Sequence, residues 1–445
     1  MVAFLGKRLK FARALKSRPY AMIWLGQTIS NLGDGIFYIA LAWQILLMTH
    51  SGTAMGIVLI AGTVPRLVFV LLGGVAADRL PRRLIILWSD GGRGLVVLLI
   101  SILGFAGLLQ FWHLVIQSLI FGFVDGFFNP AIMAITPDLV EKDDLASANA
   151  LVSLSSNLAQ LLGPLVGAGL IALISPMGAF AINALSFFIS VACLLSVRIP
   201  ERHIARTPEA REVAGEEAQV VGADLIAPVP EEAPAKRRGF RGVVEDIQEG
   251  LIYLKSTPWL WVTTVSASVG NIGFTATLAV ATPKLVHDVY GQGAWLFGLI
   301  SAMGAVGSVI ALLLIGQATR LKKRGLLSYL SLVVSCVGIV IFGLPFPRGA
   351  EPFIASLASA LVTFGLTFFN TIFFTVLHET IPADKLGRVI SLDTLGSFSM
   401  IPVGEALGGI LTDRVGPAFV FVFFGLFNLV NVLIPLLVRE VRELE

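Results

Sequence analysis

The sequence predicts an all-α membrane protein with twelve transmembrane helices, arranged as two parallel six-helix repeats around a central cavity. Three observations support this prediction. Of the 445 residues, 56% are hydrophobic and only 14% are charged, whereas soluble proteins carry about 25% charged residues. Apolar runs long enough to cross a bilayer recur along the chain. The two halves of the sequence also repeat each other.

Twelve apolar stretches are long enough to span the membrane as helices, which satisfy their backbone hydrogen bonds internally. They lie near 20–47, 53–76, 84–109, 112–136, 147–173, 177–197, 259–283, 293–318, 326–346, 352–377, 389–412 and 417–438. These spans predict an N-terminal bundle over 19–197 and a C-terminal bundle over 259–438.

The remaining segments are expected to lie on the cytoplasmic side. Residues 1–18 form a basic amphipathic segment, and 439–445 form a short tail. The linker at 198–258 has a middle rich in Ala, Glu and Pro, which predicts disorder over 205–235. Apolar residues at helical spacing between 240 and 254 predict a surface helix before the seventh span.

Basic residues fix the expected orientation. The side that holds both termini carries 27 Lys and Arg residues, and the opposite side carries three. The positive-inside bias therefore predicts cytoplasmic termini. The basic start of the chain, around Lys7 and Arg8, argues against a cleavable signal peptide.

The two halves match without a gap at an offset of 241 residues. The triplet 127–129 (FFN) falls on 368–370 (FFN), and the basic loop 79–83 falls on 320–324. Gly163 falls on Gly404, and Gly167 falls on Gly408. Because each half holds an even number of spans, both halves have the same orientation, which is typical of transporters with a central site between them.

Several motifs resemble those of the major facilitator superfamily. Residues 74–83 (GVAADRLPRR) are similar to the family's signature between helices 2 and 3, with Pro81 where the family usually has Gly. Residues 163–167 (GPLVG) resemble the fifth-helix signature of its exporters. The segments 33–35 (GDG), 137–141 (PDLVE) and 145–149 (LASAN) resemble the branch of drug:proton antiporters that holds macrolide-efflux and enterobactin-exporter proteins.

This resemblance implies export by alternating access and a conformational gate built from the two signatures. Charges at a helix end and close-packed glycines are suited to bias a two-state equilibrium. The expected gate residues are Gly74, Asp78, Arg79, Arg82, Arg83, Gly163, Pro164 and Gly167. The arginine signature common in the fourth helix of proton-coupled members is absent from 115–130, where Asp125 stands instead.

Ionisable residues within spans are expensive and usually functional. Asp34, Arg66 and Asp125 are the deepest, and with Glu405 they are the candidates for proton coupling. We expect Arg66 to approach Asp34 or Asp125, so that a cavity acid binds either a proton or the substrate. Static pairing of helices is the alternative for all of them. It is the favoured interpretation for the remaining intramembrane charges, Asp90, Arg93 and Asp393.

Polar residues at helical spacing on several spans predict a wet central cavity. The candidate residues for contact with substrate are Gln27, Asn31, Tyr38, Asn129, Asn157, Gln160, Asn271, Thr275, Thr367 and Asn370. Neighbouring Phe side chains are suited to an amphipathic ligand.

These features predict a proton-coupled exporter of amphipathic drugs, macrolides or siderophore-like molecules in the bacterial inner membrane. We expect a monomer whose partners are the substrate, protons and lipids. A metabolite facilitator or importer, and a lipid flippase or membrane scaffold, are the alternatives. The sequence has no phosphate-binding loop, metal-ligand cluster or nucleophile constellation. We therefore expect no enzymatic activity, cofactor or metal, and no nucleic-acid partner.

Overall fold

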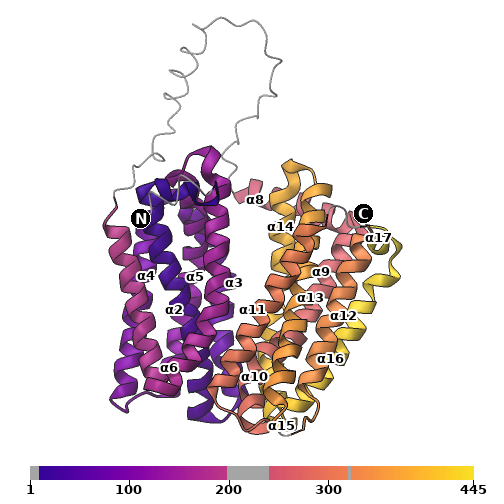
Figure 1. The fold of residues 1–445 in the computed structure, drawn as a ribbon. Helices are drawn as coiled ribbons and strands as arrows, with labels where there is room; N and C mark the ends of the chain where they lie inside the picture. Colours follow the sequence, from indigo (N-terminus) through magenta and orange to yellow (C-terminus); the bar gives the residue numbers. More distant parts are fainter. Residues whose placement is uncertain (1–9, 198–239, 319–321, 348, 445) are drawn as a thin grey trace, which may run out of the picture.

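The computed structural model describes residues 10–197, 240–318, 322–347 and 349–444, and within these ranges the chain is helical without strands. Two helical bundles stand side by side (Figure 1). The start of the basic N-terminal segment and the predicted disordered stretch at 205–235 lie outside the described residues.

The N-terminal bundle follows a short helix η1 (Lys10–Lys16). Its long helices are α2 (Arg18–Thr49), α3 (Gly52–Arg79), α4 (Arg82–Phe105), α5 (Phe111–Leu139) and α6 (Leu145–Leu195), with the turn η2 (Lys142–Asp144) before α6. Ser175, with φ 80° and ψ 165°, breaks α6 directly before Pro176. Because α6 therefore crosses the membrane twice, the eleven membrane-length helices of the described chain give twelve crossings. The predicted fold class is confirmed.

The C-terminal bundle begins with α8 (Phe240–Ser256), where the sequence predicts a surface helix. The seventh crossing of the chain, the first of this bundle, is α9 (Pro258–Thr275). It continues through π-helical η3 (Ala276–Ala281), α10 (Thr282–Lys284) and π-helical η4 (Leu285–Val289). The next crossings are α11 (Ala294–Gln317), α12 (Arg324–Phe342) and α13 (Glu351–Thr380). The eleventh crossing is interrupted between α14 (Ala383–Phe398) and α15 (Ile401–Val415). The chain ends with α16 (Pro417–Leu433), η5 (Pro435–Leu437) and α17 (Arg439–Arg442).

Small residues let helices pack closely at equivalent places in the two repeats. A Cβ on Gly163 would lie 2.7 Å from the Cα of Gly35, so α6 and α2 touch backbone to backbone. In the other half, a Cβ on Gly404 would lie 2.9 Å from the Cα of Ile272. Side chains cannot fit at either crossing, as expected where van der Waals packing holds membrane helices together.

The two bundles meet at one end and separate at the end that carries the chain termini (Figure 1). We call these the closed end and the open end. Near the closed end α3 packs on α15, and α6 packs on α11. A Cβ on Gly298 would lie 2.6 Å from the carbonyl oxygen of Pro164, which shows how tightly α6 and α11 fit.

Candidate functional site

A central cavity of about 520 Å³ lies between the bundles, within the size range of sites for small organic molecules. The N-terminal half contributes Asn31, Asp34, Tyr38, Ser156 and Gln160 to its polar wall, and the C-terminal half contributes Thr282, Ser301, Ser308, Ser359 and Thr363. Of the described residues that line it, only Asp34 is charged. Apolar side chains such as Phe297 and Phe342 complete the wall. This mixture suits a ligand with apolar and hydrogen-bonding parts.

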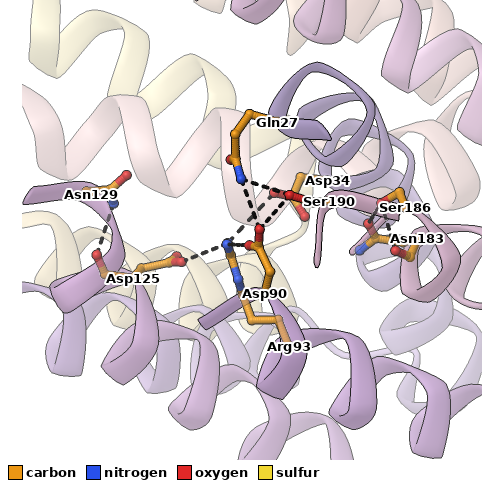
Figure 2. Close-up of polar contacts among 9 residues, drawn as sticks. All are labelled: Gln27, Asp34, Asp90, Arg93, Asp125, Asn129, Asn183, Ser186 and Ser190. Carbon is orange, nitrogen blue, oxygen red and sulfur yellow. Dashed lines mark hydrogen bonds and ion pairs between the residues drawn. The ribbon is translucent and has the colours of Figure 1, made fainter. Parts of the chain in front are cut away.

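Behind this wall, Arg93 of α4 contacts three carboxylates from three helices (Figure 2). Its Nη2 lies 2.6 Å from Oδ1 of Asp90, and its Nη1 lies 3.3 Å from Oδ1 of Asp125. The same Nη1 lies 4.0 Å from Oδ2 of Asp34. One guanidinium cannot neutralise three ionised carboxylates, so this acid cluster carries an excess of negative charge unless protons or a ligand cation bind to it.

The three acids differ in how completely they are bound. Asp90 is fully buried, and its Oδ2 accepts hydrogen bonds from Gln27 Nε2 at 2.9 Å and Ser190 Oγ at 2.7 Å (Figure 2). Asp34 has a half-exposed side chain, and its Oδ1 has no hydrogen-bond partner in the described part of the chain. Asp34 therefore lines the cavity with one buried oxygen still unpartnered, whereas Asp90 is held by hydrogen bonds and by Arg93 as a structural counter-ion.

Aromatic rings enclose the shared guanidinium. The Cζ of Arg93 lies 4.3 Å from the ring centroid of Phe128 and 4.7 Å from that of Phe187. Both rings are close enough to add a cation–π attraction. They fix the position from which Arg93 reaches the acids.

Arg66 does not make the ion pair expected from the sequence. Arg93 takes that place, and the exposed Arg66 forms no ion pair with any residue that the structure describes. Arg66 is within electrostatic range of Asp125 and of Glu405. Depth along the helices placed Arg66 with the deep acids and Arg93 nearer a helix end, but it did not indicate which helix faces meet.

Glu405 lies where the two halves touch. It is buried, and its Oε1 accepts a hydrogen bond of 2.7 Å from the hydroxyl of Thr63 in the other half. Its Oε2 has no partner among the described residues. This position joins α15 to α3 beside the central cavity rather than in its wall.

The predicted substrate residues divide among separate hollows. Asn31, Tyr38 and Gln160 line the central cavity, as expected for a shared polar wall. A second hollow of about 230 Å³ within the N-terminal half includes Gln27, Asn31 and Asn129, and a third of about 140 Å³ within the C-terminal half includes Asn271 and Asn370. Outside these linings are Thr367, whose hydroxyl donates to Ser308 at 2.9 Å, and also Asn157 and Thr275.

Of the predicted gate residues, Arg82 and Arg83 make contacts within the N-terminal half, whereas Pro164 packs against Gly298 of the other half. Arg82 Nη1 binds Asp138 at 2.6 Å and the carbonyl of Ala134 at 2.7 Å, and Arg83 donates to the carbonyl of Leu194 at 3.0 Å. These bonds tie the start of α4 to α5 and α6. Gly74 borders open space, Arg79 is exposed, and the side chain of Asp78 lies outside the described residues.

Sequence reasoning missed a contact that joins the halves at the closed end. Asp413 of α15 accepts hydrogen bonds from the backbone N–H groups of Gly52 at 2.7 Å and Thr53 at 2.9 Å, and from the hydroxyl of Ser51 at 2.6 Å. Lys284 Nζ lies 2.6 Å from the same carboxylate. The carboxylate thus caps the N-terminus of α3 from the opposite half. The available signal was Lys284 itself, one of three basic residues on the sparsely charged side.

Two six-helix halves around a polar cavity define a membrane transporter of the alternating-access class. The chain belongs to the Major Facilitator Superfamily, whose model matches residues 23–404. It is therefore a multi-pass membrane transporter.

Two relatives match over nearly their full length. Macrolide efflux protein A of Streptococcus pyogenes is 23% identical over 423 residues, which cover 95% of this chain and 96% of the relative. Enterobactin exporter EntS of Citrobacter koseri is 28% identical over 442 residues, which cover 96% and 94%. Both relatives are named as exporters, which supports a role in efflux.

Solved structures support the fold. A bacterial homologue of the iron transporter ferroportin, in its inward-facing state, superposes with a TM-score of 0.65 at 15% identity and covers 94% of this chain and 98% of its own. A POT family transporter in complex with 5-aminolevulinic acid gives a TM-score of 0.66 at 13% identity, with 95% and 96% covered. At such identities the likeness concerns the fold alone.

Proposed function

We propose that the protein is a secondary active exporter of small amphipathic compounds, driven by proton antiport. The observation that carries this proposal is the double position of Asp34. Its carboxylate belongs to the Arg93 cluster and is also the one charge among the described residues that line the central cavity. A proton or a bound substrate can therefore relieve the same excess of negative charge.

The proposed cycle uses Asp34 as the site of competition. The basic residues of the open end favour a cytoplasmic location for that end, and the proposed cycle therefore assigns the structure to an inward-open state. Substrate enters from the cytoplasm and displaces the proton of Asp34. After the halves rock, a proton from the outside displaces the substrate, and the protonated carrier returns. Because Asp34 binds either the proton or the substrate but not both, each crossing carries only one of them. The proton and the substrate therefore move in opposite directions.

The cavity wall supports amphipathic substrates. A single acid among hydroxyl, amide and aromatic groups favours neutral or cationic compounds with an apolar body. The names of the relatives, a macrolide efflux protein and an enterobactin exporter, are compatible with substrates of this general kind. A bacterial inner-membrane location and a monomeric state belong to the same proposal.

Transport in proteoliposomes with an imposed pH gradient tests this function. Wild type, Asp34→Asn and Asp288→Asn are compared on a panel of macrolides and lipophilic cations. Asp288, paired with His287 at the closed end, supplies the same chemical change away from the cavity. We expect gradient-driven transport in wild type and Asp288→Asn, and a loss of at least tenfold in Asp34→Asn. Transport at a rate that is independent of the pH gradient and unchanged in Asp34→Asn would contradict antiport and indicate a facilitator.

A further inference from the structure

A separate cavity of about 140 Å³ lies inside the C-terminal half, between α9, α12, α13, α14 and α16. It shares no lining residue with the central cavity. Most of its apolar wall is aromatic, formed by Phe274, Tyr329, Phe369, Phe373, Phe374 and Phe398. Phe374 and Phe398 are partly exposed, which makes them suited to form its mouth.

A buried carboxylate without a cation lines this cavity. Asp393 is 3% exposed, and its Oδ1 accepts a hydrogen bond of 2.6 Å from Thr264. Within the described ranges it forms no ion pair, in contrast to Asp90, which is equally buried but contacts Arg93. Acids at membrane depth are normally paired, so an acid without a protein cation is suited to pair with a cationic ligand.

A break in the eleventh crossing borders the same cavity. Helix α14 ends at Phe398 and α15 begins at Ile401, and Thr394 and Ser397 of the last turns of α14 line the cavity. Interrupted helices form the ligand and ion sites of many transporters. The carbonyl of Ser397 is oriented by a 2.9 Å hydrogen bond from Asn271.

The aromatic rings that line the cavity also pack on one another. Tyr329 meets Phe369 edge to face with centroids 5.4 Å apart, and Phe369 stacks on Phe373 at 5.8 Å. Ring faces attract ammonium groups, particularly where water is excluded. The volume is below that of sites for whole drug-sized molecules, so it suits one small aryl ammonium group.

We infer that this cavity is a binding site for an aryl ammonium group, with Asp393 as its counter-ion. The site deepens the proposed export function, on which its role as a substrate subsite rests. It admits a small aryl ammonium compound or the corresponding part of a larger substrate. Its ligand is held by charge and ring contacts that do not involve Asp34.

Equilibrium binding of radiolabelled benzyltrimethylammonium to the full chain in lipid nanodiscs tests this inference. The quaternary nitrogen keeps its charge at every pH, and neopentylbenzene is a neutral competitor of the same shape. We expect Asp393→Asn to weaken binding at least tenfold and Asp393→Glu to retain most of it. Neopentylbenzene should compete at least tenfold less well than unlabelled benzyltrimethylammonium. Because no gradient is imposed, binding can succeed even if gradient-driven export fails.

A matched pair of aromatic variants localises the site. Phe373→Leu removes a ring from the cavity and should weaken binding several-fold, whereas Phe419→Leu removes an exposed ring of α16 and should not. Gel filtration and thermal unfolding show whether each variant folds. If Asp393→Asn does not fold, the comparison of charged and neutral ligands in wild type and the Phe373→Leu result decide the matter. Equal binding by wild type and Asp393→Asn, equal competition by neopentylbenzene, or no binding at all would overturn the inference.

Discussion

At the residue scale, Arg93 organises the charged centre of the N-terminal half because a planar guanidinium can donate in several directions at once. It lies close to two aromatic rings and contacts Asp90, Asp34 and Asp125. Only Asp34 also faces the central cavity. This division separates an acid that holds the cation in place from an acid that is free to exchange its partner.

The division predicts different effects for two Asp→Asn substitutions. Asp90→Asn removes the shortest ion pair of a buried arginine, which retains two weaker acidic neighbours. We expect a loss of about 3 kcal/mol in the free energy of unfolding, at the lower end for a broken buried pair. Unfolding of the purified protein in detergent measures it, with Asp288→Asn expected to change stability by less than about 0.5 kcal/mol. Equal stability of wild type and Asp90→Asn would contradict a structural role for this acid.

The residue-level part of the site could be predicted only partly from the sequence. Depth within a span identified Asp34 and Asp125 as unusual, because any carboxylate far from both membrane surfaces needs a reason. It also placed Arg93 about two turns from a helix end, which favoured a local pair with Asp90. The local pair exists, but the reach of Arg93 to α2 and α5 depends on how three helices rotate about their axes, and hydropathy does not determine this.

At the element scale, glycines set the distance between helices α2 and α6. Gly163 has a backbone neighbour where its Cβ would be, whereas Gly169, six residues further along α6, has open space around it. The continuous hydropathy of the chain predicted both helices, and the break at Ser175 follows from Pro176, where the sequence also ended a span. The interruption at 399–400 was not predicted, because its residues continue an apolar run.

Gly163→Ala and Gly169→Ala should therefore change stability in opposite directions. Alanine at position 169 restricts the unfolded chain and meets nothing, so we expect a gain of about 0.5 kcal/mol. Alanine at position 163 would push α6 away from Gly35 and should lower stability by about 1–3 kcal/mol. Thermal unfolding of the two variants in the same detergent compares them directly. A destabilised Gly169→Ala together with an unaffected Gly163→Ala would show that this crossing is not close-packed.

At the scale of the whole molecule, several polar contacts between the halves at the closed end converge on one carboxylate. Asp413 binds the first turn of α3 and Lys284 at once. Gly52, one of its partners in the other half, is 361 residues away from Asp413 in the sequence. No local pattern predicts a contact of this kind. Opening of the closed end must break these charge-assisted bonds, so Asp413 stabilises the state described here.

Asp413→Ala should shift the equilibrium towards opening at the closed end. Spin labels at Trp112 and Phe353, which are exposed near the closed end of opposite halves, report the distance between the halves in a variant without Cys193 and Cys336. We expect the population with long distances to rise several-fold, because charged hydrogen bonds contribute about 1.5–3 kcal/mol each. Asp288→Ala at the same end serves as the control. An unchanged distance distribution in Asp413→Ala would exclude this carboxylate as a lock.

The central claim is that Asp34 binds either a proton or the substrate, and proton release on substrate binding tests it most directly. A pH-indicator dye in a weakly buffered detergent solution records protons that leave the purified protein when a transported compound is added. The account predicts release from wild type and from Asp288→Asn, and no release from Asp34→Asn. Binding of the compound to wild type without proton release, or equal release from Asp34→Asn, would contradict it.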